Sequence, residues 1–398
     1  MAMADKWNRL DGVDALRSFA ILFVLLNHVN MRLLLAHVPY TRGLPSQLVS
    51  AMVWNGQRGV QMFFAISGFL ITSMSLRRWN SLAEVKIREF YMLRFARIAP
   101  LMLLLLAILS VLDWQHVPGF VIRPAAGGLG RALLAALTFH INLLEAHRGY
   151  LPPNWDVLWS LSVEELFYFC FPLICRALRH EWIIASLLLL FVALGPIGRT
   201  VLSHGNPIWQ EYSYLGCMDA IALGCLTALM LSRCRLSRRQ IYCCGAGGLL
   251  LLATVLGLST YLDQWGLGRS GLDMTVVAIG TCLLVAAAAQ SGWRGSRTLR
   301  SLLLPGRRSY EIYLVHMFVV LALFGRFVAM GKPLVVVPIL FVTVIIAATL
   351  SGEIVARLFS EPLNKWLRRG IRYVGGDTIA QSPMTLNDMN QRKVSSNC

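Results

Sequence analysis

The sequence predicts an all-α protein, a polytopic transmembrane helical bundle of about ten spans. Hydrophobic residues make up 56% of the 398 residues and charged residues only 14%, whereas a soluble domain carries about 25% charged residues. The apolar residues also occur in runs of about 20, the helix length that crosses a hydrocarbon core of about 30 Å. No run shows the alternation over about ten residues that is typical of a membrane β-barrel.

The apolar runs predict the spans in chain order. The ten expected spans cover residues 15–36, 59–76, 98–113, 161–178, 182–203, 212–231, 240–261, 271–290, 309–329 and 333–357. An amphipathic segment at 84–97 leads into the third span, and a weaker apolar segment lies at 129–146. If the weak segment also crossed, the basic loops could not all lie on one face. We therefore expect it to remain on one side as a re-entrant or tilted element.

The net charge of +17 indicates orientation in the membrane. The basic residues gather in three loops and near the C-terminus. The first loop has Arg77, Arg78, Lys86, Arg88, Arg94 and Arg97, and the second has Arg233, Arg235, Arg238 and Arg239. The third loop has Arg294, Arg297, Arg300, Arg307 and Arg308, and the C-terminal segment has Arg368, Arg369 and Arg372. Because positively charged loops stay inside, both termini are expected in the cytosol, with a leader at 1–12 and a disordered tail at 366–398. No nucleic-acid-binding motif is present, so no nucleic-acid partner is expected.

The first span carries two ionisable residues on one face. Arg17 and His28 are eleven positions apart, which on a helix is about three turns and about 16 Å between Cα atoms. Ionisable residues at membrane depth are costly and indicate a functional site that faces the protein interior. The neutral imidazole of His28 can act as a general base on a hydroxyl group; the alternative is a packing hydrogen bond between helices. Asp14 lies three residues before Arg17, at a spacing that allows an ion pair.

Two further pairs are candidates for binding. Arg94 and Arg97, at the entrance to the third span, present two guanidinium groups on one face and suit bidentate binding of phosphate. The alternative is a positively charged anchor at the membrane edge. Glu164 and Glu165 begin an apolar span, where they either complement the helix dipole beside a Ser162 cap or orient a substrate hydroxyl.

Several other ionisable residues lie within or beside the spans, and together with His28 they indicate a polar cavity in the bundle; they are Asp219, His316, Glu353 and Glu361. The sequence has no HExxH motif, no histidine pair at metal-binding spacing and no Walker-type glycine loop. The nine cysteines show no metal-binding or disulfide pattern. We therefore expect no metal and no tightly bound cofactor.

Six motifs in order carry a family resemblance. They are 14–17 with His28, 59–72, 94–97, 159–165, 309–316 and 361–362. The set resembles the acyltransferase-3 family of bacterial membrane O-acyltransferases, which modify surface polysaccharides, lipopolysaccharide, Nod factors and macrolides. The resemblance implies an acyltransferase-3 membrane domain at 13–365, in the bacterial cytoplasmic (inner) membrane.

The resemblance also implies a reaction. An acyl-CoA, most often acetyl-CoA, is the co-substrate; it binds from the cytosolic side with its phosphates on Arg94 and Arg97. The acceptor is a hydroxyl group of a carbohydrate or glycolipid. The implied catalytic residues are His28, Arg17 and Asp14, with His28 either deprotonating the hydroxyl or carrying the acyl group. The implied substrate-binding residues are Trp159, Ser160, Glu164, Glu165, Tyr310 and His316.

The chain departs from the family pattern at three positions, which concern the acceptor side. It has Gln61 where Asp is common, Leu166 where Gln is common and Cys217 where Arg is common. The alternative function is a proton-coupled secondary transporter or flippase, for which His28 would carry the proton. Transporters usually show a repeat between their halves, and 1–200 shows no clear similarity to 200–398.

Overall fold

The computed structural model describes residues 10–296 and 298–374, which form a helical bundle without a strand. Ten segments of this part of the chain are long and apolar enough to cross a membrane. They are Asp11–Leu35 (α1), Ser46–Trp79 (α2 and α3), Ile87–Trp114 (α4), Pro153–Leu178 (α7 and α8), Glu181–Arg199 (α9), Pro207–Arg233 (α10 and α11), Arg238–Gly257 (α12), Leu272–Ser291 (α14), Ser309–Ala329 (α16) and Leu334–Arg369 (α17 and α18). Each expected span corresponds to one segment, so the predicted fold class is confirmed.

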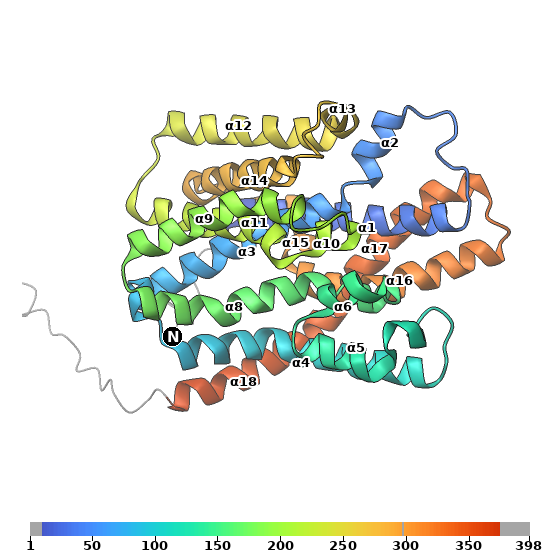
Figure 1. Ribbon diagram of the computed structural model, residues 1–398, viewed down its shortest axis with the longest axis horizontal. Coiled ribbons are helices and arrows are strands. Elements are labelled where there is room, and N and C mark those ends of the chain that lie inside the picture. The colour runs from blue at the N-terminus through green and yellow to red at the C-terminus, as the bar shows by residue number, and fades with distance from the viewer. Residues whose placement is uncertain (1–9, 297, 375–398) are drawn as a thin grey trace, which may run out of the picture.

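Several of these segments contain two helices, and short helices connect others. The paired helices are Ser46–Val53 (α2) and Gly56–Trp79 (α3), Pro153–Asp156 (α7) and Trp159–Leu178 (α8), Pro207–Tyr212 (α10) and Tyr214–Arg233 (α11), and Val337–Val355 (α17) and Glu361–Val374 (α18). The short connecting helices include Ser259–Gln264 (α13) and Leu304–Arg307 (α15). The long helices lie side by side across the view in Figure 1.

The two ends of the bundle differ in charge. The loops rich in arginine, between α3 and α4, between α11 and α12 and between α14 and α16, meet at the left of Figure 1. We call this the basic end. The opposite end, at the right of the view, carries the short helices α2, α13 and Gly128–Leu137 (α5).

The weak apolar segment at 129–146 is broken into two short helices, Gly128–Leu137 (α5) and Ile141–Arg148 (α6). Their ten and eight residues span about 15 Å and 12 Å, too short to cross a membrane, as predicted. The chain turns at Phe139, which has a left-handed φ of 58°. Its carbonyl oxygen accepts a hydrogen bond of 2.5 Å from the hydroxyl group of Tyr214.

Helices α3 and α11 approach each other closely at two glycines. A Cβ atom on Gly68 would collide with the carbonyl oxygen of Ile221, and one on Gly224 would collide with that of Ala65. Small residues allow helix backbones in membranes to come into contact, where dispersion forces between well-packed atoms stabilise the pair. These glycines therefore fix the position of α3, which lines both cavities described below.

A buried ion pair joins four helices near the opposite end. The carboxylate of Asp219, which is fully buried, accepts two hydrogen bonds from Arg199, of 3.0 Å and 2.7 Å. Gln61 and Thr275 donate to the same carboxylate at 3.0 Å and 2.6 Å. Arg199 also donates to two backbone carbonyl groups. Because every charged atom has a partner, this cluster connects α3, α9, α11 and α14 without leaving a charge exposed to lipid.

The last span bends into a helix that lies along α4. A π-helical turn at Ala356–Ser360 joins α17 to α18. Arg308 binds both sides of this turn, through Glu353 at 2.5 Å and through Glu361. Figure 1 shows α18 running back beside α4 toward the basic end.

Helix α18 changes the expected boundary of the C-terminal segment. We assigned 366–398 to a disordered tail, but residues 366–374 are helical. Leu363 and Leu367 are partly buried while Lys365 and Arg369 are exposed, so one face of α18 packs on the bundle. Residues 1–9 and 375–398, which include most of the expected leader and tail, lie outside the described residues.

Candidate functional site

A cavity of about 770 Å³ opens at the basic end, among α1, α3, α4, α8, α16 and α18. Six arginines line it: Arg17, Arg77, Arg78, Arg94, Arg97 and Arg368. The acidic residues in its lining are Glu164 and Glu165. We call it the arginine-lined cavity. Its excess of guanidinium groups suits a ligand that carries several negative charges.

One face of α8 forms the inner wall of this cavity. Ser160, Glu164 and Tyr168 follow one another at four-residue spacing and so lie on one side of the helix. Glu164 accepts a hydrogen bond of 2.8 Å from Ser67 of α3, and the hydroxyl group of Tyr168 donates to Ser67 at 3.1 Å. The guanidinium group of Arg94 lies over the ring of Tyr168, 4.1 Å from its centre. These contacts hold Arg94 at the wall by a cation–π interaction.

The interpretation of Ser162 as a helix cap is wrong. Helix α8 begins at Trp159, so Glu164 and Glu165 lie in its second turn, beyond the reach of the exposed N–H groups of its first turn. Ser162 instead accepts a hydrogen bond of 3.2 Å from the backbone of Ile141. The alternative placement, with carboxylates facing a cavity, agrees with the position of both glutamates.

The deep end of the cavity leads to two histidines. Ser160 donates a hydrogen bond of 2.8 Å to the hydroxyl group of Tyr313, and both residues line the cavity. The backbone carbonyl group of Tyr313 accepts a hydrogen bond of 2.7 Å from Nδ1 of His316. The ring of His316 lies 5.0 Å from the ring of His28, between ring centres. Tyr313 therefore contacts both Ser160 of the cavity lining and His316, which packs against His28.

The histidine pair can accept a proton. Because a carbonyl oxygen only accepts hydrogen bonds, Nδ1 of His316 carries the hydrogen and Nε2 carries a lone pair. This Nε2 atom is buried and has no hydrogen-bond partner in the described part of the chain. His28 keeps some accessible surface, whereas His316 is fully buried. Within the described residues, His28 is therefore the better placed of the two to meet a substrate.

Helix α1 connects the cavity with the histidine pair. Arg17 lines the cavity and His28 lies three turns further along the same helix, at the spacing predicted from the sequence. Asp14 forms an ion pair that the sequence did not predict. Its carboxylate binds Arg307 at 3.1 Å, and Arg307 also binds Asp11 at 3.0 Å. Asp14 therefore anchors the start of α1 to α15, outside the cavity lining.

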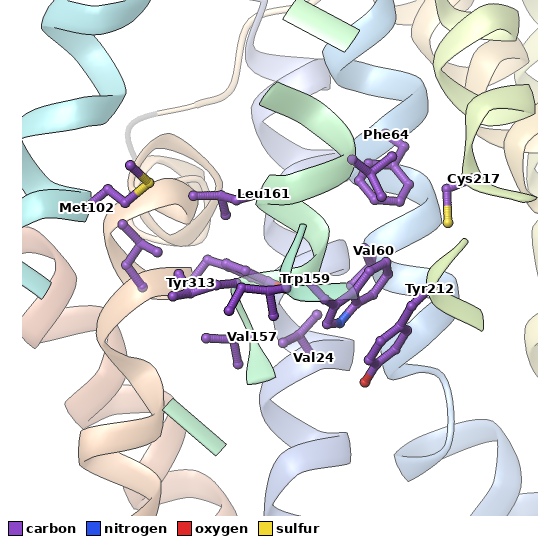
Figure 2. Packing of buried hydrophobic residues seen from close by; sticks show 14 of the residues in the cluster. Val24, Val60, Phe64, Met102, Val157, Trp159, Leu161, Tyr212, Cys217 and Tyr313 are labelled. Atoms are coloured by element: carbon purple, nitrogen blue, oxygen red, sulfur yellow. The ribbon is translucent and has the colours of Figure 1, made fainter. Parts of the chain in front are cut away.

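Trp159 lies outside the cavity lining, in the core. Its ring stacks on Tyr212 at 4.0 Å, with 4° between the ring planes, and meets the edge of Phe64 at 6.0 Å. Figure 2 shows Trp159 and Tyr212 lying face to face beside Val60. Trp159 is 4% exposed, so its role in this arrangement is to position the start of α8. Of the other expected substrate-binding residues, Ser160, Glu164, Glu165 and Tyr310 line the cavity, and His316 lies behind it.

A buried acidic pair lies near the start of α8. The hydroxyl group of Tyr212 donates to Asp156 at 3.2 Å, and Glu145 accepts a hydrogen bond of 3.0 Å from the backbone of Leu151. Burial, together with the nearby Asp156 carboxylate, raises the pKa of Glu145 well above its usual range. Burial therefore favours the neutral form of the Glu145 carboxyl group beside α8.

Sequence reasoning gave no site role to several residues of the arginine-lined cavity, among them Ser67, Tyr168, Tyr313 and Arg368. Ser67, Tyr168 and Tyr313 are uncharged and lie in apolar spans, where charge and hydropathy do not distinguish them. The four-residue spacing from Glu164 is the signal that indicates Tyr168. Arg368 was assigned to a tail, because its helix is amphipathic and too polar for a span.

These features define a class, a multi-pass membrane protein whose cationic cavity ends beside paired histidines. Residues 10–355 match the family model described as an acyltransferase domain. The chain belongs to the acyltransferase-3 family.

Several similar proteins are named as O-acetyltransferases. The chain is 25% identical over 379 residues to the O-acetyltransferase OatA of Staphylococcus aureus strain NCTC 8325 / PS 47, covering 89% of this chain and 57% of that protein. The OatA proteins of strains COL and MRSA252 match with the same identity and coverage. This chain therefore spans little more than half the length of these relatives. No solved structure matches it.

Proposed function

We propose that this protein is an O-acyltransferase that moves an acetyl group from acetyl-CoA to a hydroxyl group of a carbohydrate or glycolipid. The observation that carries the proposal is the arginine-lined cavity, which ends at Ser160 and Tyr313 beside the histidine pair. Arginines at its mouth suit the phosphates of coenzyme A. The acetyl group as donor follows the names of the relatives.

The distribution of positive charge supports binding of acetyl-CoA from the cytosolic side of the membrane. The basic end carries the arginine-rich loops, so it faces the cytosol by the positive-inside rule. Acetyl-CoA then enters from the cytosol, in a bacterial inner membrane with both termini on the cytosolic side. The phosphates bind Arg94 and Arg97 near the mouth, and the pantetheine arm extends inward along Arg17 toward His28.

The chemical step uses the lone pair of an imidazole. The hydroxyl oxygen of the acceptor bonds to the thioester carbonyl carbon, and the carbon–sulfur bond breaks. In direct transfer, His28 takes the hydroxyl proton and passes it to the sulfur, which leaves as the thiol of coenzyme A. In the alternative route, His28 first carries the acetyl group and the acceptor then attacks it.

The proposal predicts acetyl transfer by the purified protein. In nanodiscs, the protein is expected to move radioactive acetyl groups from acetyl-CoA to oligosaccharides released from the surface polysaccharide of its host cell. Free coenzyme A should appear in equal amount. Uptake of saccharide into proteoliposomes without release of coenzyme A would instead support the transporter hypothesis.

Arg368 is expected to contribute to acetyl-CoA binding. Replacing Arg368 with alanine removes one guanidinium group from the cavity lining and should raise the KM for acetyl-CoA about tenfold, with little change in kcat. Arg369→Ala is the matched control, because Arg369 is exposed on the same helix and does not line the cavity. Equal KM values for the two variants would mean that Arg368 of α18 does not contribute to acetyl-CoA binding.

A further inference from the structure

A second cavity, of about 660 Å³, lies at the opposite end of the bundle. Its volume is within the range of ligand-binding pockets, about 300–1,000 Å³. The helix that lines both cavities is α3, which presents Gln57, Arg58 and Gln61 to the second cavity and Val60 and Ser67 to the arginine-lined cavity. The histidine pair lines neither. The second cavity is therefore a separate site.

The lining of the second cavity suits hydroxyl groups better than phosphates. Two of its arginines are neutralised, since Arg199 binds Asp219 and Arg58 lies 3.4 Å from Asp273. The lining also includes the amides of Gln57, Gln210 and Gln264, the carboxylates of Asp273 and Glu211, and Arg269. Amides both donate and accept hydrogen bonds, as sugar hydroxyl groups do. This lining therefore has a smaller excess of positive charge than that of the arginine-lined cavity.

An aromatic ring and a buried polar atom complete this lining. Trp54 lines the cavity and remains 45% exposed, so one part of its indole ring is available for contact. A flat apolar ring is the surface against which the C–H face of a sugar packs. The side chain of Arg58 is 11% exposed, and its Nε atom is buried with no hydrogen-bond partner in the described part of the chain. A buried donor of this kind indicates a missing acceptor.

We propose that the second cavity binds a sugar residue of a saccharide. This inference rests on the proposed function, in which the acceptor is a carbohydrate. A sugar residue held in the second cavity does not contact the histidine pair, because neither His28 nor His316 lines that cavity. The second cavity therefore holds a residue of the acceptor other than the one that is acetylated, and it selects for saccharides longer than one residue.

The test measures binding directly, in the absence of acetyl-CoA. The probe is a tetrasaccharide released from the host cell's surface polysaccharide and labelled with a fluorophore at its reducing end. Trp54→Ala is expected to weaken its binding to the protein in nanodiscs about tenfold. Trp265→Ala is the matched control, because Trp265 is 78% exposed near the same end and does not line the cavity. Its affinity should equal that of the unmodified protein.

The test includes a second variant of the cavity lining, and a variant that lacks the histidine proposed for acetyl transfer. Gln264→Ala, next to the control position, should also weaken binding, and it replaces Trp54→Ala if that variant does not fold. His28→Ala should bind the tetrasaccharide normally while transferring no acetyl group. The proposal would be overturned if Trp54→Ala and Gln264→Ala bound the tetrasaccharide as tightly as the control Trp265→Ala. A lack of binding by the unmodified protein would also overturn it. If the unmodified protein binds the saccharide but transfers no acetyl group, the proposed function fails and the binding site stands.

Discussion

Replacing His28 with alanine is expected to lower the rate of acetyl transfer at least 100-fold, about the contribution of a general base. The variant should still insert into the membrane and accumulate, because His28 keeps some accessible surface and makes no hydrogen bond within the described residues. The measurement is the transfer of radioactive acetyl groups to saccharide by protein in nanodiscs. His180→Ala is the control, because His180 is exposed and precedes α9.

Labelling of the protein itself distinguishes the two routes of acetyl transfer. Without acceptor, the unmodified protein should become radioactive from labelled acetyl-CoA if His28 carries the acetyl group, and should remain unlabelled if transfer is direct. The His28→Ala variant should remain unlabelled in both cases. Acetylation at the normal rate in this variant would exclude His28 from the chemistry, whichever route applies.

Replacing Asp219 with alanine is expected to destabilise the protein by about 3–5 kcal/mol. The change leaves the guanidinium group of Arg199 buried without its carboxylate, and it also removes the acceptor of Gln61 and Thr275. Thermal unfolding in detergent measures the effect. Glu181→Ala is the control: the Glu181–Arg233 ion pair lies at the surface, where Arg233 is 67% exposed, so its loss should cost less than about 1 kcal/mol.

A double variant separates the buried charge from general packing. Arg199→Leu combined with Asp219→Leu removes both charges, so much of the lost stability should return. A double variant as unstable as Asp219→Ala would mean that the hydrogen bonds to Gln61 and Thr275, and not the unpaired guanidinium group, account for the loss.

The membrane spans could be predicted from the sequence because each span is a local property. A helix that crosses the hydrocarbon core needs about 20 consecutive apolar residues, whatever the rest of the chain does. The weak segment at 129–146, where the structure has two short helices, was excluded by a different argument, the placement of the basic loops on one face. The apolar runs did not predict α18, because an amphipathic helix of this kind depends on the neighbouring α4 for its apolar face.

The candidate site was only partly predictable. Arg17 and His28 share one helix, so their spacing alone placed them on one face. The pairing of His28 with His316 joins helices α1 and α16, and neither residue carries a local signal for the other. Asp14 shows the same limit. The sequence indicated a helical neighbour at three residues, and the structure adds Arg307, which is 293 positions away.

The sequence by itself therefore determined the helical class, the ten spans and the family resemblance, since all three follow from local patterns of residues. Only the tertiary structure decided which polar groups meet. A buried charge in a bundle must find a partner or a cavity, and the choice among partners depends on which helices become neighbours. That choice assigned Arg199 to Asp219 and Arg307 to Asp14, and it left the guanidinium groups of Arg94 and Arg97 in the lining of a cavity.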